Sequence, residues 1–340
     1  DEANALAIDA SGAVFVTGGF ETQCTFGTHT LNTTQTGSDA FLAKLDAKGN
    51  WTWAVRFGAQ TRGNGHHVTV DGSGQIYWAG VFRGNMKFPK HSHYGNGTDD
   101  GFLIKANTRG VPVWIRSMKS TQDVAIGGLV VGSGVVYISG HFRKDLSFFH
   151  TNDKYTSNGG SDVFVGRLGG AGSWSWTRAL GSTSWERNNA LHVTKTGDVV
   201  VAGTSYARFS PGAFVLEKHG TQTLMSRQYD PQGGLKGGFA GGGAQAEDMS
   251  ALCDDGQGGF WMLGQTQSGV MHFGDRAYGL LTNTQSTLFL AHFRGAFLCP
   301  SSGHMSCGGV CTEVQNNTKH CGVCGNACGV GLTCSGGKCQ

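Results

Sequence analysis

The chain is poor in charge, in proline and in long apolar runs. Charged side chains make up 14% of the 340 residues, well below the roughly one quarter found in an average globular domain, and only five prolines occur. No run of about 18 apolar residues is present, so the sequence predicts no membrane span. The net charge of +3 comes with no basic run, which argues against a nucleic-acid partner. No segment shows helical apolar periodicity, which excludes helical bundles and coiled coils.

Catalytic motifs are missing as well. The sequence contains no G-x-S-x-G, no H-E-x-x-H and no phosphate-binding glycine loop. Glu217 and Asp198 form no grouping in the sequence that would mark paired catalytic carboxylates, so a glycan-acting hydrolase is the least favoured function. The sequence therefore predicts a non-enzymatic protein without a cofactor.

The chain is rich in glycine, with 57 residues, and many of these glycines belong to an internal repeat. Five runs of β-branched and aromatic residues end in a glycine, at intervals of 60 to 63 residues. These glycines are Gly18, Gly80, Gly140, Gly203 and Gly264. A short strand with an Asp or Gly turn precedes each run, and a third strand follows it. Repeats of four strands predict an all-β fold, namely a β-propeller of five four-stranded blades.

The strands within each repeat are also expected from the sequence. The third strands are expected at 39–45, 100–105, 162–168, 212–218 and 287–293, followed by turns at Gly49, Gly110, Gly172, Gly220 and Gly295. The fourth strands are expected at 51–56, 113–116, 174–178 and 224–227. An excursion separates the second and third strands in every repeat except the fourth. Residues 233–243 are expected as a glycine-rich insertion, either a mobile loop or a packing arm held by Phe239.

These repeats resemble the SBBP-type β-propeller repeats of exported bacterial proteins, notably myxobacterial ones. The resemblance rests on "DGSGQIYWAG" (71–80), "FGTHTLNTTQTGSDAFLAKLDAKGNWTWAVRFG" (26–58) and "GGSDVFVGRL" (159–168), and it covers residues 3 to 295. It implies that the strand with the Asp turn lies nearest the propeller axis and that the Trp-Arg strand is outermost. It implies little about function, because propellers carry many activities.

Eight of the ten cysteines lie in the last 42 residues. Because this tail has few apolar residues, we expect the eight to form four disulfides; a zinc site at Cys321-x-x-Cys324 is the alternative. The eight are Cys299, Cys307, Cys311, Cys321, Cys324, Cys328, Cys334 and Cys339. Residues 311–339 resemble the cysteine-rich module of plant stigma-specific and myxobacterial surface proteins, which implies an oxidising compartment. We therefore expect a propeller at 1–298 and a disulfide module at 299–340.

The other two cysteines, Cys24 and Cys253, lie in repeats one and five, which are neighbours in a five-bladed ring. They form either a bridge that closes the ring or two unrelated buried thiols. Four N-x-S/T sequons fit an exported protein and are possible glycosylation sites. Their asparagines are Asn32, Asn50, Asn96 and Asn316.

Other polar residues recur with the fold. Asp9, Asp71 and Asp254 are isolated at hairpins, which favours turn chemistry over calcium binding. Two histidine pairs suggest metal binding. His66 and His67 are consecutive on a strand and face opposite ways, so they do not easily share one ion, and His91 and His93 are better explained as polar surface residues; no metal site is predicted. The repeated Arg56, Arg116, Arg178 and Arg227 are expected to cover tryptophan faces or to pair across blades.

Repeat five lacks a fourth strand in the sequence, which leaves an edge at Leu288, Phe289, Leu290, Ala291, His292 and Phe293. A strand preceding this chain, its own segment 296–300 or a neighbouring subunit would cover this edge. We expect a non-enzymatic extracellular or cell-surface structural or binding protein that contacts proteins, itself included, or a cell-surface glycan. The first reading includes a subunit of an extracellular filament; the alternative is a carbohydrate-binding propeller lectin or adhesin.

Overall fold

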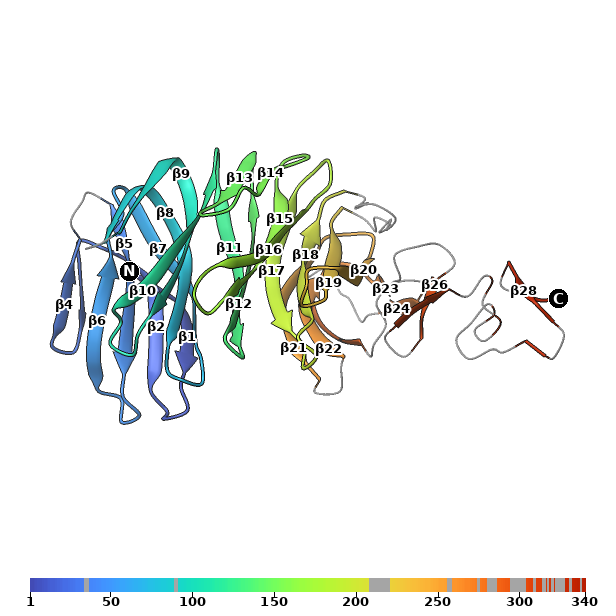
Figure 1. Cartoon of the computed structure of the whole chain (residues 1–340), viewed down its shortest axis with the longest axis horizontal. Coiled ribbons are helices and arrows are strands. Elements are labelled where there is room, and N and C mark those ends of the chain that lie inside the picture. Colours follow the sequence, from blue (N-terminus) through green and yellow to red (C-terminus); the bar gives the residue numbers. More distant parts are fainter. Residues whose placement is uncertain are drawn as a thin grey trace. The chain divides into compact units, whose positions relative to one another are not determined.

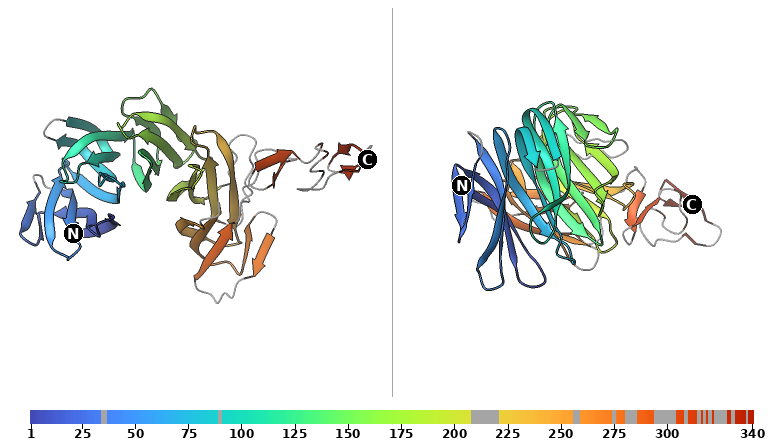
Figure 2. Two further views of the ribbon diagram at one scale, coloured as in Figure 1. Left: turned by 60° about the horizontal axis from the view of Figure 1, so that its bottom comes forward. Right: turned by 60° about the vertical axis from the view of Figure 1, so that its left-hand side comes forward.

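The chain is all-β in its computed structural model, as the sequence predicts, and no helix occurs among the described residues (Figures 1 and 2). The structure describes residues 1–33, 37–88, 91–207, 221–255, 259–273, 276–279, 286–293, 304–307, 310–313, 316, 318, 321, 328–329, 332–336 and 338–340. The chain divides into two compact parts, Asp1–Ala179 and Leu180–Gln340. The predicted boundary at residues 298 and 299 lies outside the described residues.

The N-terminal part contains the first three repeats, each with four antiparallel strands in chain order. Repeat one consists of β1 (Glu2–Ile8), β2 (Val14–Glu21), β5 (Ser38–Leu45) and β6 (Trp51–Phe57). Repeat two consists of β7 (Arg62–Val70), β8 (Ile76–Phe88), β9 (His91–Ala106) and β10 (Pro112–Ser120). Repeat three consists of β11 (Val124–Gly132), β12 (Val135–Phe142), β15 (Asp162–Gly169) and β16 (Trp174–Leu180).

The C-terminal part contains the last two repeats and the tail. Repeat four consists of β17 (Glu186–Val193), β18 (Val199–Ser205), β19 (Thr223–Tyr229) and β20 (Leu235–Gly242). Repeat five consists of β21 (Glu247–Asp254), β22 (Phe260–Thr266) and β25 (Thr287–Phe293). The tail contains β26 (His304–Cys307), β27 (Val310–Glu313), β28 (Cys334–Ser335) and β29 (Lys338–Cys339).

Hairpins lie at the predicted excursions between the second and third strands. They are β3 (Gln23–Phe26) with β4 (His29–Asn32), β13 (Asp145–Phe148) with β14 (Lys154–Thr156), and β23 (Val270–Phe273) with β24 (Arg276–Gly279). In repeat two the excursion instead lengthens β8 and β9, which pair as far as Phe88 and His91.

The strand prediction for repeat four is wrong. The partner of β18 is β19, so the segment predicted as the fourth strand is the third, and the expected third strand at 212–218 and its turn at Gly220 lie outside the described residues. The glycine-rich segment is not an insertion: Gly233, with φ of 82°, makes the turn, and β20 is the fourth strand. The side chain of Phe239 is outside the described set.

The repeated glycine has a structural cause that the sequence did not reveal. Opposite each one, the first strand carries one extra residue, a β-bulge that interrupts the pairing register. The bulge turns a backbone carbonyl of the first strand toward the glycine, so that a Cβ on Gly140 would overlap the carbonyl oxygen of Ala125 and lie 2.7 Å from the Phe164 ring. Only glycine leaves this space free.

Every repeat has one buried carboxylate at the same level along its sheet. It lies on the third strand in repeats one to three and on the first strand in repeats four and five. The five residues are Asp39, Asp100, Asp162, Glu186 and Glu247, each at most 2% exposed. Asp39 Oδ1 accepts a hydrogen bond from the backbone N–H of Ala59 at 3.2 Å, and Glu186 Oε2 accepts one from Ser182 at 2.7 Å. Asp39 and Glu186 therefore hold linkers between repeats, whereas Asp162 accepts bonds from Asn158 within its own repeat.

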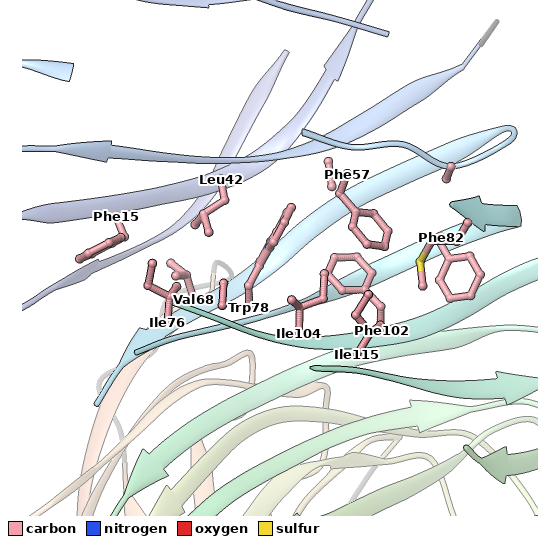
Figure 3. Packing of buried hydrophobic residues seen from close by; sticks show 14 of the residues in the cluster. Phe15, Leu42, Phe57, Val68, Ile76, Trp78, Phe82, Phe102, Ile104 and Ile115 are labelled. Carbon is pink, nitrogen blue, oxygen red and sulfur yellow. The ribbon is translucent and has the colours of Figure 1, made fainter. Parts of the chain in front are cut away.

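Aromatic side chains fill the interface between repeats one and two (Figure 3). Phe57 stacks on Phe102 with centroids 4.5 Å apart, and Trp78 meets both rings edge-on. A second cluster packs repeat two against repeat three, and another packs repeat four against repeat five. Each sheet thus buries an apolar face against the next sheet within its own part, as stacked repeats do.

Candidate functional site

The predicted edge of repeat five is the main candidate site. In repeats one to four the third strand pairs with a fourth strand, as β5 pairs with β6 and β19 with β20. In repeat five the described sheet has three strands and ends at β25, which pairs with β22. The residues that would follow as a fourth strand, including the segment 296–300, lie outside the described residues, so the open edge stays a prediction.

The side chains of β25 alternate between a packed and an exposed face. Phe289 is 7% exposed and belongs to the core shared with repeat four, and Phe293 stacks on Phe260 at 4.9 Å. On the other face Leu288 is 73% exposed and Leu290 is 64% exposed. Leu263 of the neighbouring β22 adds a side chain that is 40% exposed.

The polar end of this face is fixed. The His292 ring stacks on Trp261 at 4.0 Å, nearly parallel, and His292 Nε2 lies 2.8 Å from Asp255 Oδ2. An exposed apolar strip formed by Leu263, Leu288 and Leu290, next to a rigid aromatic pair at the last strand of a sheet, is the kind of surface that binds an extended polypeptide. We refer to these three leucines as the leucine strip.

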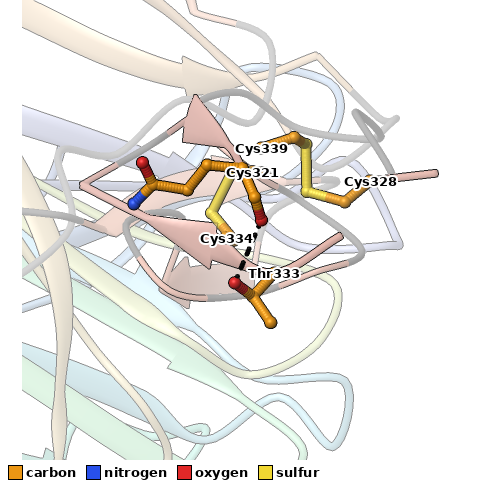
Figure 4. Close-up of a disulfide and its surroundings, with 6 residues drawn as sticks. Cys321, Cys328, Thr333, Cys334 and Cys339 are labelled. Atoms are coloured by element: carbon orange, nitrogen blue, oxygen red, sulfur yellow. Dashed lines mark hydrogen bonds between the residues drawn. A yellow bond between two sulfur atoms is a disulfide. The ribbon is translucent and has the colours of Figure 1, made fainter. Parts of the chain in front are cut away.

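The tail contains two disulfides among its described residues. Cys321 pairs with Cys334, and Cys328 pairs with Cys339 (Figure 4). Thr333 Oγ1 donates to the carbonyl of Gln340 at 3.1 Å beside them.

The structure does not describe the side chains of the other four tail cysteines. Cys299 and Cys324 lie outside the described residues, as do the side chains of Cys307 and Cys311. The one group of described side chains with metal-ligand spacing is Cys321, Cys328 and Cys339, with sulfur atoms within 4.8 Å of one another. Because all three sulfurs are in disulfides, they are not available as thiolate ligands.

Cys24 and Cys253 are free thiols in this structure. They lie in the two separate parts of the chain, so a bridge between them stays a prediction. Cys24 is half-buried and packs against the cluster of Phe20 and Phe41 in its own repeat, and this burial raises its pKa to about 11. Cys253 is exposed on β21.

The aspartates at the hairpins form the turns that the sequence predicts. Asp9 Oδ1 accepts hydrogen bonds from the hydroxyl of Ser11 and from the backbone N–H groups of Ser11 and Ala13, and the bond from the Ser11 hydroxyl lowers its pKa most. Asp71 makes the same bonds to Ser73 and Gln75. The side chain of Asp254 is outside the described set.

The histidines belong to no described metal-ligand group. Burial lowers the pKa of His66 to about 4 and also lowers that of His67. His67 Nε2 lies 3.3 Å from the carbonyl oxygen of Ile126 in the next repeat. The side chains of His91 and His93 lie outside the described set.

Two of the four repeated arginines, Arg116 and Arg178, cover tryptophan faces, and Arg116 also pairs with the next repeat, as predicted. Arg116 lies over Trp114 at 5.3 Å, and its Nε donates to the carbonyl of Gly172 in the next repeat at 2.6 Å. Arg178 lies over Trp176 in the same way. Trp114 and Trp176 are each 7% exposed, so these rings offer little face for stacking on a sugar.

The other two arginines of the set, Arg56 and Arg227, have different surroundings. Arg56 Nη1 donates to Asp39 Oδ2 at 3.0 Å. Arg227 is 1% exposed, and burial lowers its pKa to about 10.

The sequon asparagines that the structure describes are exposed. Asn32, Asn50 and Asn316 lie at the surface, and the side chain of Asn96 is not described. Asn50 Nδ2 donates to the Asp46 carboxylate at 3.1 Å, which is a bond that a glycan on this nitrogen would disturb.

Comparison with known proteins identifies no family. No protein-family model matches the chain, and no curated protein matches it by sequence. Fifteen chains of solved structures match. One is the crystal structure of Sqt1 from Chaetomium thermophilum, 9% identical over 91% of this chain and 88% of that chain, with a TM-score of 0.29. A TM-score this low carries no argument about fold or function.

Proposed function

We propose that this chain is a non-enzymatic extracellular or cell-surface structural protein that assembles with copies of itself through the edge of repeat five. One observation carries the proposal: the described sheet of repeat five ends at β25 and exposes Leu288 and Leu290, at the place where the other repeats have a fourth strand.

We also infer that the five repeats are the blades of one β-propeller. Support comes from the common strand order, the bulge opposite each repeated glycine, and the burial of one sheet face against the next repeat.

An extracellular location is supported by the tail. Disulfides form and persist in oxidising compartments and stabilise small modules with little core, and two are present here. Three exposed sequons fit this location. No helix among the described residues is long and apolar enough to cross a membrane.

Association through this edge has a physical basis. The end strand of a sheet offers backbone groups that can pair with another chain, and burying the leucine strip adds a hydrophobic gain of about 25 cal/mol per Å². If the edge pairs with a different surface of the neighbour, the contact is heterologous and generates filaments unless a ring closes, whereas pairing of two β25 edges gives a closed dimer.

Light scattering of purified protein over a range of concentrations tests this function. We expect particles heavier than the 35.8 kDa chain that dissociate on dilution. Leu288→Lys with Leu290→Lys should leave a monomer, because charges on an edge strand prevent pairing. Leu235→Lys on β20, where the leucine is 39% exposed, is the matched control and should assemble like the wild type. A wild-type chain that stays monomeric at all concentrations contradicts the proposal.

A further inference from the structure

The two disulfides of the tail lie against each other. The sulfur atoms of Cys321, Cys328 and Cys339 are within 4.8 Å of one another (Figure 4). Cys334 Sγ is bonded to Cys321 Sγ, so a fourth sulfur adjoins the other three. Four thiolates around one zinc ion, each about 2.3 Å from it in a tetrahedron, lie roughly 3.8 Å from one another. The tail therefore gathers four sulfurs at nearly the spacing of a zinc site with four cysteine ligands.

A hairpin positions two of these cysteines by backbone bonds. Cys334 on β28 and Cys339 on β29 lie opposite each other in the register. The N–H of Thr333 donates to the carbonyl of Gln340 at 2.8 Å, and the N–H of Gln340 donates to the carbonyl of Thr333 at 2.9 Å. Gly336, with φ of 56°, adopts the left-handed backbone that a tight turn requires. These bonds place both cysteines without a contribution from either disulfide.

The sulfur cluster has a buried side and an accessible side. Cys321 is fully buried and Cys334 is 6% exposed, whereas Cys328 and Cys339 are half-buried. The N–H of Cys328 donates to the carbonyl of Thr318 at 2.8 Å, which fixes the backbone on the accessible side. Burial restricts the access of water to a bound metal ion, and the half-buried side gives a reductant and a metal ion a path to the sulfurs.

This set of ligands differs from the Cys321-x-x-Cys324 pair that the sequence spacing suggests. Cys324 lies outside the described residues. The described residues bring Cys321 together with Cys328 and Cys339 instead. Cysteine thiolates favour zinc over magnesium and calcium, which prefer oxygen ligands.

We propose that Cys321, Cys328, Cys334 and Cys339 bind one zinc ion when their two disulfides are reduced, so that the tail has one fold with two alternative crosslinks. Each disulfide accepts two electrons and two protons from a dithiol, which is itself oxidised to a disulfide. The four thiols that result release four protons as they bind Zn²⁺. Zinc binding by the tail goes beyond the proposed function and does not depend on assembly through repeat five.

Differential alkylation of the full, unmodified chain tests this site. The chain is reduced with a phosphine, which supplies no competing thiol, and is then given zinc without oxygen and treated with iodoacetamide. Peptide masses identify the cysteines that zinc protects. We expect zinc to remain bound on gel filtration and to protect all four cysteines, while the exposed Cys253 reacts with or without zinc. Magnesium in place of zinc should protect none of them.

A variant with serine at the other four tail cysteines isolates the proposed site. Those four are Cys299, Cys307, Cys311 and Cys324. This variant should bind one zinc ion per chain when it is reduced and none when its two disulfides are formed. Adding Cys328→Ser and Cys339→Ser leaves two thiolates and should abolish zinc retention on gel filtration.

Three results would overturn the zinc site. They are a reduced, unmodified chain that retains no zinc, alkylation of any of the four cysteines while zinc is bound, and zinc retention that survives Cys328→Ser with Cys339→Ser. Zinc held by the other tail cysteines alone gives the second of these results. Because the unmodified chain is read by itself, a variant that fails to fold does not hide the answer.

Discussion

Replacing Gly140 with alanine tests the explanation of the repeat most sharply. A Cβ at this position overlaps the carbonyl oxygen of Ala125 and lies 2.7 Å from the Phe164 ring, and both are held by the β-bulge and the core. Because backbone cannot move aside as a flexible side chain does, we expect an overpacking cost of about 2 kcal/mol. For a part of the size of Asp1–Ala179, that lowers its melting temperature by roughly 4–8 °C.

Gly132 provides the matched control in the same sheet. No atom lies within 4 Å of a Cβ built there, so Gly132→Ala should change stability by less than about 1 kcal/mol. Thermal unfolding of the full chain, followed by circular dichroism and calorimetry, gives both values. If the two variants melt together, the carbonyl contact does not explain why the repeat requires glycine.

Three further predictions concern a buried acid, the tail and an arginine. Burial raises the pKa of Glu186, so the stability it contributes is present below the unfolded pKa of about 4.3 and is lost as pH rises through the folded pKa. Melting curves at a series of pH values should lack this pH-dependent stability in Glu186→Ala and retain it in Glu21→Ala, which changes an exposed residue. If the melting temperatures of both variants depend on pH in the same way, the role of Glu186 is contradicted. Removing the Cys321–Cys334 disulfide, whose cysteines are 13 residues apart, should cost about 3 kcal/mol and speed proteolysis of the tail alone; faster cleavage elsewhere would argue against a separate module. Arg116→Ala should cost about 1 to 2 kcal/mol in urea unfolding by losing its bond to the next repeat, and an unchanged midpoint would refute that role.

The sequence predicted those features that are local. The turns at Asp9 and Asp71 need only a carboxylate and a glycine a few residues apart, and the repeat spacing follows from the glycines. The position of each strand within repeats one to three follows from runs of β-branched and aromatic residues between glycine turns.

Features that depend on pairing were not predictable in this way. In repeat four, segments 212–218 and 223–229 both match a strand pattern, and only the register of Gly203 opposite Met225 identifies the third strand. The bulge is a property of two paired backbones, so the repeated glycine that lies opposite it does not reveal it until the strands are paired. The movement of the buried carboxylate from the third strand to the first, as in Glu186, becomes visible only when the strands are aligned.

The candidate site likewise has features that the sequence reveals and features that it does not. The sequence shows that repeat five lacks the fourth-strand pattern after 288–293, and the open edge itself stays a prediction. Disulfide pairing was likewise open, because eight cysteines permit many combinations.

Hydrogen exchange of the peptide that covers β25 (Thr287–Phe293), measured at high and low protein concentration, tests the central claim most directly. If a strand from another subunit adds to this edge, the amides of β25 are protected at high concentration and exchange faster on dilution, while those of the central strand β22 do not change. Protection of β25 that is the same at both concentrations would contradict assembly through this edge.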